Sequence, residues 1–298
     1  MTSKYQNAKK YFITSKIEAP LEKVLQEHLP AVNADNLIKS GGIWRNRSRL
    51  SSAETHILAG DTLIVYVAPD QGRKYKLDPK TIIKETKDWL VIDKPSAITV
   101  ASDRSNTTYN LTFAVGEYLK SKNCLYTPTP ITRLDFMVQG LVIYPKSKSA
   151  EIKLFKAMMN GDIDKTYVAA LPSHDPITEE LIVKDKIGFK GKTSIDPEGK
   201  EAISELKFLK RELEIDYYLM RPITGRRHQL RFHAARHLKP LIGDTLYGSK
   251  YTHPDEKIAL IAIKYKLECD HQIVEIELPN WQEKIAHIAS EATLKKTH

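Results

Sequence analysis

The chain has 298 residues, of which 41% are hydrophobic and 28% charged, a balance typical of a folded protein with room for two domains. It has no run of about 20 apolar residues, no apolar signal core near its start, and two cysteines far apart in sequence, Cys124 and Cys269. We therefore expect a cytoplasmic protein without a membrane segment, disulfide framework or zinc site, and the net charge of +9 favours a polyanionic partner.

Residues 1–14 are expected to form a tail, and a small α/β module follows over residues 15–68. Apolar residues at helical spacing follow Pro20, and a second short helix ends at Gly41-Gly42, where glycine supplies the left-handed backbone of a helix end. The expected elements are helices over 20–29 and 35–40, an extended segment over 43–46 and a strand over 62–66. Four cations on the second helix and the following loop fit a solvated surface as well as RNA contact when taken alone: Lys39, Arg45, Arg47 and Arg49.

Residues 69–80 are polar and rich in turn-forming residues, which predicts a linker. Residues 81–290 alternate strand-like and helix-like segments, and residues 291–298 are expected to form a C-terminal tail. The irregular, hairpin-like spacing favours an α+β fold with a mixed, mainly antiparallel sheet over a regular βαβ series. The expected elements are strands over 89–92, 141–144, 166–171 and 215–219, and helices over 110–119, 149–159 and 225–238.

Motifs of several common enzyme classes are absent from the sequence. It lacks G-x-G-x-x-G after a strand, G-x-x-x-x-G-K-[ST], G-x-S-x-G and H-E-x-x-H, which argues against dinucleotide binding, P-loop chemistry, an α/β-hydrolase and a zinc peptidase. His233 and His237 are spaced to share one helix face, but no carboxylate or cysteine stands at ligand spacing beside them. We therefore expect no metal site.

Asp135 is the first candidate for chemistry, because it lies among apolar residues just before a predicted buried strand. Partial desolvation disfavours the charged carboxylate, and Arg133 or another arginine brought near would keep it ionised. Taken alone, this segment favours a structural ion pair between Asp135 and an arginine over a catalytic group. Tyr167 opens a later strand and, taken alone, is typical of half-buried packing with a bonded hydroxyl.

Arg221 to Pro240 forms a second basic window without an acid. Thr224 is placed to cap a helix whose first-turn amides would form an anion site, and Arg227 and Arg231 are four residues apart on one face. A glycine-led, arginine-dense helix start favours phosphate binding in RNA. The cations of this window are Arg221, Arg226, Arg227, Arg231, Arg236 and Lys239.

Read together, these segments resemble the pseudouridine synthases of the RluA type over residues 80–280. The resemblance rests on motifs in a fixed order: Asp93-Lys94-Pro95, Arg133-Leu134-Asp135 with Gly140, Lys165-x-Tyr167, Thr224-Gly225-Arg226-x-His228-Gln229-Leu230-Arg231-x-His233, and Pro240-Leu241-Ile242-Gly243-Asp244-x-Leu246-Tyr247-Gly248. The module over 15–68 resembles a small RNA-binding domain first recognised in a small-subunit ribosomal protein, through Ile38-Lys39-Ser40-Gly41-Gly42-Ile43, Asn46 and Gly60-Asp61.

The resemblance implies isomerisation of uridine to pseudouridine in structured RNA, without a metal or organic cofactor. Asp135 falls on the family's catalytic aspartate, Tyr167 on its active-site tyrosine and Arg231 on the arginine that pairs with the aspartate. Arg133 matches an arginine that helps to open the RNA and to fill the space left by the flipped base. Further RNA contacts are expected from Lys39, Arg45, Arg47, Arg49, Arg226, Arg227, His228 and Gln229.

An aspartate is ionised at neutral pH and needs no activating base. The sequence leaves open whether it attacks the anomeric carbon or carbon 6 of the ring, or stabilises an elimination. A leading RNA-binding module favours large-subunit ribosomal RNA as the target, with transfer RNA second, and we expect a monomer.

The sequence departs from the family at Thr132, Val138-Gln139, Ser96-Ala97 and Leu260-Ile261-Ala262, which affects the expected rate, loop geometry and choice of target. Two other hypotheses remain. One is a non-catalytic RNA-binding or ribosome-assembly protein on the same fold, against which the retained Asp135, Tyr167 and Arg231 argue. The other is a small-molecule enzyme, whose RNA affinity would be insensitive to salt.

Overall fold

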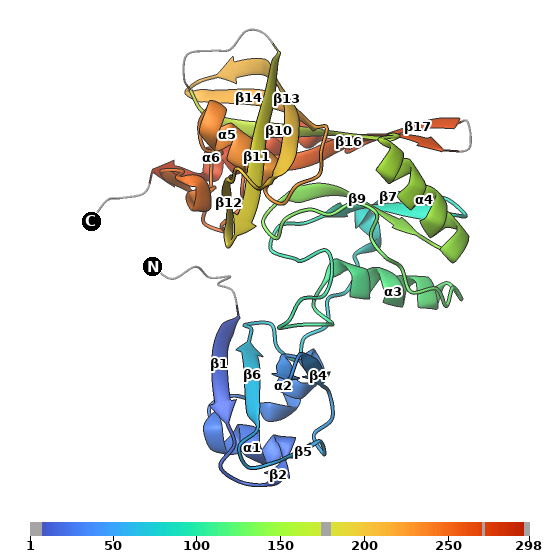
Figure 1. Ribbon diagram of the computed structural model, residues 1–298. Helices are drawn as coiled ribbons and strands as arrows, with labels where there is room; N and C mark the ends of the chain where they lie inside the picture. The colour runs from blue at the N-terminus through green and yellow to red at the C-terminus, as the bar shows by residue number, and fades with distance from the viewer. Residues whose placement is uncertain (1–7, 174–179, 270–271, 295–298) are drawn as a thin grey trace. The chain divides into compact units, whose positions relative to one another are not determined.

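The structure, a computed structural model, describes residues 8–173, 180–269 and 272–294 (Figure 1). The chain divides into two compact units. The first joins the described residues up to Pro79 with Ile98–Pro130, and the second joins Lys80–Ala97 with the described residues from Ile131 onward. None of the helices described has the length and apolar character that crossing a bilayer requires.

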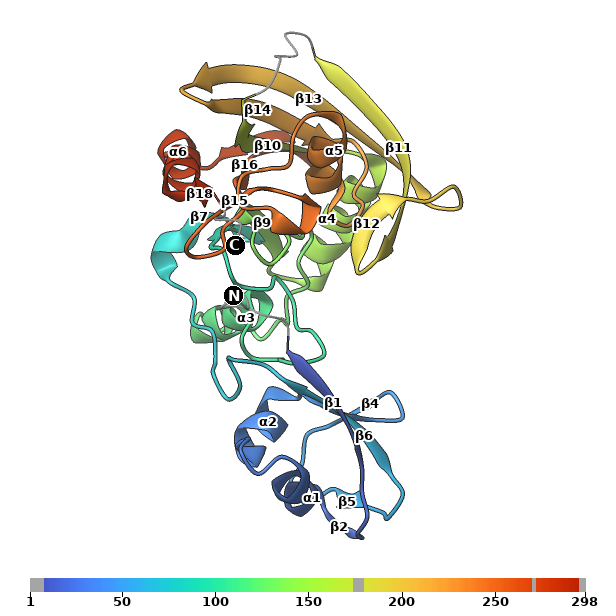
Figure 2. The same ribbon diagram turned by 90° about the vertical axis from the view of Figure 1, so that its left-hand side faces the viewer.

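The first unit contains a four-stranded antiparallel sheet with two helices on one face. Its strand order is β1 (Lys9–Thr14), β6 (Thr62–Val67), β3 (Ile43–Arg45) and β4 (Ser48–Leu50), and β2 (Ala19–Pro20) pairs with β5 (His56–Ile57). Helices α1 (Leu21–His28) and α2 (Ala34–Ser40) lie against one face of the sheet (Figure 2) and share its apolar core. The predicted helices are confirmed, and α2 ends at Gly41 with a φ of 72°.

Two predicted boundaries of this unit are wrong. Lys9–Thr14, expected in a tail, form β1, because all six residues pair with β6 and Ile13 enters the core; residues 1–7 of that tail lie outside the described residues. Ile98–Pro130, expected in the second domain, belong to the first unit and contain α3 (Leu111–Ser121). Backbone hydrogen bonds explain the assignment, since the Thr107 amide donates to Ser40 O at 3.0 Å and the amide of Tyr75, in the expected linker, donates to Thr108 O at 3.0 Å.

The second unit is a ten-stranded sheet, mixed and mainly antiparallel, which confirms the predicted fold class. Among the described pairs, β9 and β16 run parallel and all the others run antiparallel. The strand order is β12 (Lys192–Ile195), β11 (Leu181–Lys190), β13 (Lys200–Glu212), β14 (Ile215–Pro222), β10 (Ile163–Pro172), β16 (Leu260–Cys269), β9 (Gln139–Pro145), β8 (Trp89–Lys94) and β7 (Ile82–Glu85), with β17 (Gln272–Glu277) pairing with β16.

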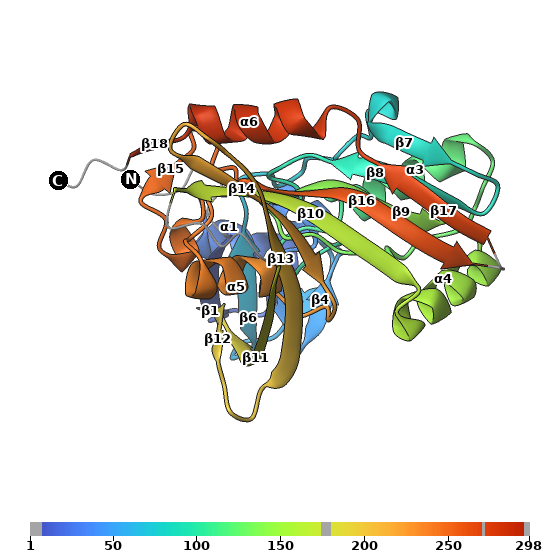
Figure 3. The ribbon, with the colours of Figure 1, turned by 90° about the horizontal axis from the view of Figure 1, so that it is seen from above.

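Helices cover both faces of this sheet. Figures 2 and 3 show α6 (Trp281–Glu291) on one side of β10 and β16, and α4 (Lys148–Asn160) and α5 (Gln229–His237) on the other. Ser147 caps the start of α4, its Oγ accepting a hydrogen bond from the Ala150 amide at 3.1 Å, and Gly161, with a φ of 85°, caps the end. The predicted helix over 149–159 is therefore confirmed.

The predicted start of α5 is wrong. The helix begins at Gln229 rather than Gly225, and Thr224 does not cap it. Instead, Thr224 Oγ1 donates to Gln229 Oε1 at 2.7 Å and accepts from the Ile203 amide at 2.9 Å. The Arg226 amide also donates to Gln229 Oε1, at 2.9 Å. The expected anion site of first-turn amides is thus replaced at Arg226 by a loop closed on the Gln229 side chain.

The end of the chain also differs from the expected tail over 291–298. Glu291 closes α6, and β18 (Thr293–Leu294) pairs with β15 (Tyr251–Thr252). Residues 295–298 lie outside the described residues. Because of this antiparallel pairing, residues 293 and 294 form a strand of the second unit rather than a tail.

Candidate active site

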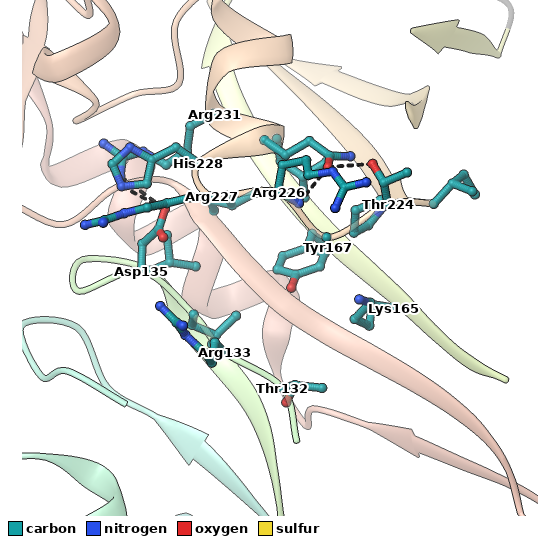
Figure 4. A pocket seen from close by; sticks show the side chains of 18 of the residues that line it. Thr132, Arg133, Asp135, Lys165, Tyr167, Thr224, Arg226, Arg227, His228 and Arg231 are labelled. Carbon is teal, nitrogen blue, oxygen red and sulfur yellow. Dashed lines mark hydrogen bonds and ion pairs between the residues drawn. The ribbon is translucent and has the colours of Figure 1, made fainter. Parts of the chain in front are cut away.

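A cavity of about 580 Å³ lies in the second unit. Its walls come from the loop before β9, the C-terminal end of α4, the start of β10, and the loop and first turn that join β14 to α5. Figure 4 shows Asp135, Tyr167 and Arg231 converging there from three of these segments. The fold thus brings together residues that are about 100 positions apart in sequence.

Asp135 is held by a guanidinium from α5. Arg231 Nη1 lies 3.2 Å from Asp135 Oδ2, while Nε and Nη2 donate to the two oxygens of Asp244 at 2.7 and 2.8 Å. The side chain of Asp135 is 25% exposed and that of Asp244 is 1% exposed, so Asp135 is the carboxylate of this pair that a substrate can reach. Burial by itself lowers the pKa of Arg231, but bonding and attraction to Asp244 and Asp135 outweigh it and raise the pKa.

His228 lies near the same carboxylate oxygen as Arg231. Its Nε2 is 3.7 Å from Asp135 Oδ2, and its Nδ1 is 3.1 Å from the Tyr247 hydroxyl. The backbone of His228 is left-handed, with a φ of 53°, which turns the ring back toward the cavity at the start of α5. Burial lowers the pKa of His228, with Asp135 opposing the shift, so the ring is neutral at pH 7.

Tyr167 contributes an aromatic side chain to the cavity wall. A register shift between Thr166 and Tyr167 in the β10–β16 pairing changes the direction of the strand at this position. The Tyr167 hydroxyl bonds to the buried Tyr265, whose own hydroxyl donates to Leu141 O at 2.5 Å. Burial, together with Tyr265, raises the pKa of Tyr167 well above its ordinary value, so the phenol is protonated at neutral pH.

A hairpin formed by β11 and β12 supports the arginine-rich loop before α5. Thr193 Oγ1 donates to Arg227 O at 2.7 Å, and the Thr193 amide donates to the Tyr247 hydroxyl at 2.8 Å. The Arg227 guanidinium stacks 3.9 Å from the centre of the Phe189 ring. These contacts fix the loop from the side of the sheet, so that Arg226, Arg227 and His228 line the cavity.

The loop that carries Asp135 is fixed through its carbonyl groups. Lys94 Nζ donates to Pro95 O at 2.8 Å and to Phe136 O at 3.2 Å, and Ser96 Oγ donates to Met137 O at 3.0 Å. Burial lowers the pKa of Lys94 to about 7, with Asp135 and Asp93 opposing the shift. The two residues that follow Asp135 are therefore tied to the end of β8.

Most of the predicted site residues meet in this cavity: Asp135, Tyr167, Arg231, Arg133, Arg226, Arg227, His228 and Gln229. An arginine does pair with Asp135, and of the two possibilities left open it is one brought near by the fold, Arg231, rather than the neighbouring Arg133. Among the described residues, Arg231 is the cation within ion-pair distance of Asp135, the neutral ring of His228 lies 3.7 Å from the same oxygen, and Arg133 is exposed.

The other four predicted residues lie in the first unit and do not line this cavity. Lys39 pairs with Asp35 at 2.5 Å, Arg45 pairs with Asp61 at 2.7 Å, and Arg47 is exposed in the turn between β3 and β4. Arg49 stacks on Trp44, 4.6 Å from the ring centre, and donates to Asp103 O at 2.7 Å. Three of the four cations therefore have partners within their own unit.

No site role was predicted for Asp244, Lys165 or Tyr247, although all three lie in the motifs that resemble those of the pseudouridine synthases. Asp244 and Tyr247 follow α5 and fold back onto Arg231 and His228, a contact that no helical spacing could reveal. Lys165 lines the cavity two residues before Tyr167, and burial lowers its pKa against the opposing charge of Asp164.

The sequence also showed no carboxylate beside His233 and His237, whereas the fold brings Asp185 from β11 to within 2.7 Å of His237 Nε2. His233 Nδ1 contacts Ser204 Oγ at 2.9 Å. In the part of the chain that the structure describes, no group of three His, Cys, Asp or Glu side chains is arranged to hold a metal ion.

Comparisons with a family model and with curated proteins give one result. The family model described as "RNA pseudouridylate synthase" matches residues 88–236. An "Uncharacterized RNA pseudouridine synthase" of Aquifex aeolicus is 26% identical, and the alignment covers 82% of each chain. A "Ribosomal large subunit pseudouridine synthase C" of Rickettsia bellii is 30% identical, with 67% of each chain covered. The human "Pseudouridylate synthase RPUSD2" is 28% identical over 58% of this chain, which spans 31% of the human protein.

Solved structures show the same fold at low sequence identity. The "Human RNA Pseudouridylate Synthase Domain Containing 4" has a TM-score of 0.58 at 18% identity, covering 72% of this chain and 94% of that one. The "Human RNA Pseudouridylate Synthase Domain Containing 1" has a TM-score of 0.55 at 20% identity, covering 67% of this chain and 83% of that one. Because the family match spans half of the chain and the Rickettsia relative is matched over two thirds of both chains, the chain belongs to the RNA pseudouridine synthase family.

Proposed function

We propose that the chain converts specific uridines of large-subunit ribosomal RNA to pseudouridine, with Asp135 as the catalytic carboxylate. The observation that carries the proposal is the asymmetric sharing of Arg231. Its two bonds to the buried Asp244 fix the guanidinium, and its single bond to Asp135 holds a partly exposed carboxylate at the wall of a cavity of about 580 Å³.

The reaction changes the atom of the uracil ring that is bonded to the ribose, from N1 to carbon 5. The bond between the anomeric carbon and N1 breaks, a bond from the anomeric carbon to carbon 5 forms, the carbon 5 proton leaves and N1 gains a proton. Asp135 can serve this exchange by attack on the anomeric carbon or on carbon 6, or by stabilising an elimination. All three routes need an ionised oxygen facing the base, and both contacts described for Asp135 reach Oδ2, which leaves Oδ1 toward the substrate.

The base must leave its stack to reach Asp135, which costs a few kcal/mol. Arginines on the cavity wall would offset this cost through phosphate contacts, and we assign this role to Arg226 and Arg227, with exposed Arg133 filling the space of the extruded base. Tyr167 would pack against the uracil as a neutral phenol, because its raised pKa keeps it protonated.

The choice of RNA rests on the relatives. Proteins named "Ribosomal large subunit pseudouridine synthase" C and D match this chain over 67% and 72% of its length, from Rickettsia bellii and Vibrio cholerae respectively. We propose the same class of target here. The role of the first unit as an RNA-binding module belongs to the same proposal.

Asp135→Asn tests the reaction. Tritium release from RNA carrying carbon-5-labelled uridine should fall by roughly a thousandfold or more, because the amide cannot act as a nucleophile. Asp88→Asn, a change at an exposed aspartate of the same unit, should release tritium at the wild-type rate. Filter binding of the same RNA should be unchanged in both variants.

The target RNA can be identified in cells that lack the gene and are complemented with either the wild type or Asp135→Asn. Pseudouridine mapping of total RNA should show sites in large-subunit ribosomal RNA that only the wild type restores. Equal restoration by both proteins would refute the role of Asp135. Sites restored only in transfer RNA would overturn the choice of RNA, and no site in any RNA would favour a non-catalytic binding protein.

A further inference from the structure

The open face of the first unit's sheet carries aromatic side chains in register. Phe12 on β1 is paired with Ile64 on β6, Ile64 with Trp44 on β3, and Trp44 with Arg49 on β4. Side chains in register point to the same face, so these four residues form one row across all four strands. Three spacings of about 4.8 Å make the row roughly 14 Å long.

A second row lies beside the first and adds a further ring and two cations. Lys10 is paired with Tyr66, and Lys10 Nζ lies 4.3 Å from the centre of the Phe12 ring and 6.0 Å from that of Tyr66. Arg104 donates to the Tyr66 hydroxyl at 3.3 Å. Three aromatic rings thus alternate with Lys10, Arg49 and Arg104 on one surface.

The apolar core of the unit contains none of these rings. Trp44 and Tyr66 are half-buried against the backbone and side chain of Arg104, with Trp44 Nε1 donating to Arg104 O at 2.9 Å, whereas Phe12 has no such support. The apolar core is on the opposite face, where Ile13, Leu63 and Val65 of the same strands are buried beneath α1 and α2. Phe12 is 67% exposed, although burying a phenylalanine is worth about 1.5–3 kcal/mol. A phenylalanine left in water beside two further rings indicates a binding surface rather than a structural role.

The charges on this face select the occupant. Its two rows contain cations and no acid. The carbonyl of Asp103 accepts a hydrogen bond from Arg49, while its carboxylate accepts hydrogen bonds from the amides of Ser105 and Asn106. Rings interleaved with cations match the alternation of bases and phosphates in single-stranded RNA. We propose that this sheet face, defined by Lys10, Phe12, Trp44, Arg49, Tyr66 and Arg104, stacks unpaired nucleobases of the RNA substrate.

The proposal rests on the proposed function in taking RNA as the partner, and it assigns the contact to the sheet rather than to α2 and its following loop. Phe12→Ala in the full chain tests it, because an exposed ring can be removed without harm to the core. Affinity for a labelled 12-nucleotide oligouridylate should fall roughly five- to a hundredfold, as expected for the loss of one stacked base. The slope of log affinity against log salt should not change, since no charge is lost.

Matched variants and probes separate stacking from other causes. Leu125→Ala, at an apolar side chain of the same unit that is 87% exposed and outside the two rows, should bind like wild type. Phe12→Tyr should restore affinity, and an abasic oligonucleotide of equal length should bind wild type and Phe12→Ala equally. Photo-crosslinks from 5-iodouridine should map to positions 12, 44 and 66.

Several results would overturn the proposal. These are wild-type oligouridylate affinity in Phe12→Ala, an equal loss on the abasic probe, or crosslinks confined to α2 and the turn at Arg47. Sedimentation showing a wild-type dimer that Phe12→Ala dissolves would assign the face to a second copy of the chain. Absence of tritium release from the wild type would count against the proposed function. The difference in oligouridylate affinity between wild type and Phe12→Ala would still test this proposal, because binding does not depend on catalysis.

Discussion

Two carboxylates, Asp135 and Asp244, contact the guanidinium of Arg231 in the cavity. The number of hydrogen bonds that each accepts indicates its role. Asp244 accepts two bonds from Arg231 in the planar, bidentate geometry that fixes a guanidinium most firmly, whereas Asp135 accepts one longer contact. We regard Asp244 as a positioning residue, because it is 1% exposed and lies behind Arg231 rather than against the substrate.

Asp244→Asn should therefore reduce the rate more than it reduces binding. With one anchor weakened, the Arg231 fork can turn toward Asp135 and engage both of its oxygens, which lowers the reactivity of that carboxylate. We expect the single-turnover rate of tritium release to fall about 10- to 100-fold with KM changed less, and the stability to fall by about 1–3 kcal/mol. Asp255→Asn, at a surface aspartate, is the control. Wild-type rate and stability in Asp244→Asn would show that Arg231 needs no second partner.

At the scale of elements, the parallel contact between β9 and β16 depends on the absence of a side chain at Gly140. A Cβ atom there would lie 2.3 Å from Ala262 O and 2.6 Å from Ala262 N, and its φ is +114°. Both strands are buried at this point, so neither backbone can retreat without disturbing the sheet.

Gly140→Ala should lower the free energy of unfolding by about 3 kcal/mol or more, since backbone strain and a backbone clash add. Gly161→Ala is the matched control, because Gly161 also has a positive φ, +85°, but nothing lies within 4 Å of its Cβ position. That change should cost about 1 kcal/mol. Urea denaturation of both variants measures the difference, and equal losses would mean that the β9–β16 approach adapts freely.

The elements that the sequence predicted are those with strong local signals. α4 has a serine cap and a glycine end, and β8 and β9 are continuous apolar runs. The paired strands β11 and β13 were missed, because their inward side chains include Asp185, Ala202 and Ser204, which interrupt the apolar alternation that predicts a strand. The late start of α5 could not be predicted either, because it depends on the Gln229 side chain closing the preceding loop.

The candidate site, like the fold, was predictable where the residues lie in local motifs and not where the contacts depend on tertiary packing. Asp135, Tyr167 and Arg231 stand in recognisable motifs, and the cavity contains all three. The partner of Asp135 was not predictable from the isolated segment, where Arg133 is the neighbour in sequence but Arg231 is the neighbour in space. Contacts of this kind depend on tertiary packing, which local spacing does not encode.

At the scale of the whole molecule, a buried histidine makes stability depend on pH. His233 is fully buried beneath the sheet, and burial lowers its pKa from 6.5 to about 4, with Asp185 opposing the shift and His237 adding to it. The folded chain therefore binds fewer protons at this residue than the unfolded chain between pH 6.5 and about 4. Its contribution to stability is complete above pH 6.5 and is lost as the pH falls toward 4.

His233→Gln should remove this dependence while keeping a polar group next to Ser204 Oγ. For the wild type, the free energy of unfolding should fall by up to about 1.4 kcal/mol per pH unit through His233 alone as the pH drops below 6.5. The variant should be less stable at pH 8 but should lose less on acidification. The remaining slope comes from His228, His253 and, above pH 7, Lys94, whose pKa values are also lowered by burial. Urea denaturation between pH 4.5 and 8 gives both slopes, with His287→Gln, at a side chain that is 64% exposed, as the control. Parallel curves for wild type and His233→Gln would mean that the ring at position 233 takes up a proton in the folded chain as readily as in the unfolded one.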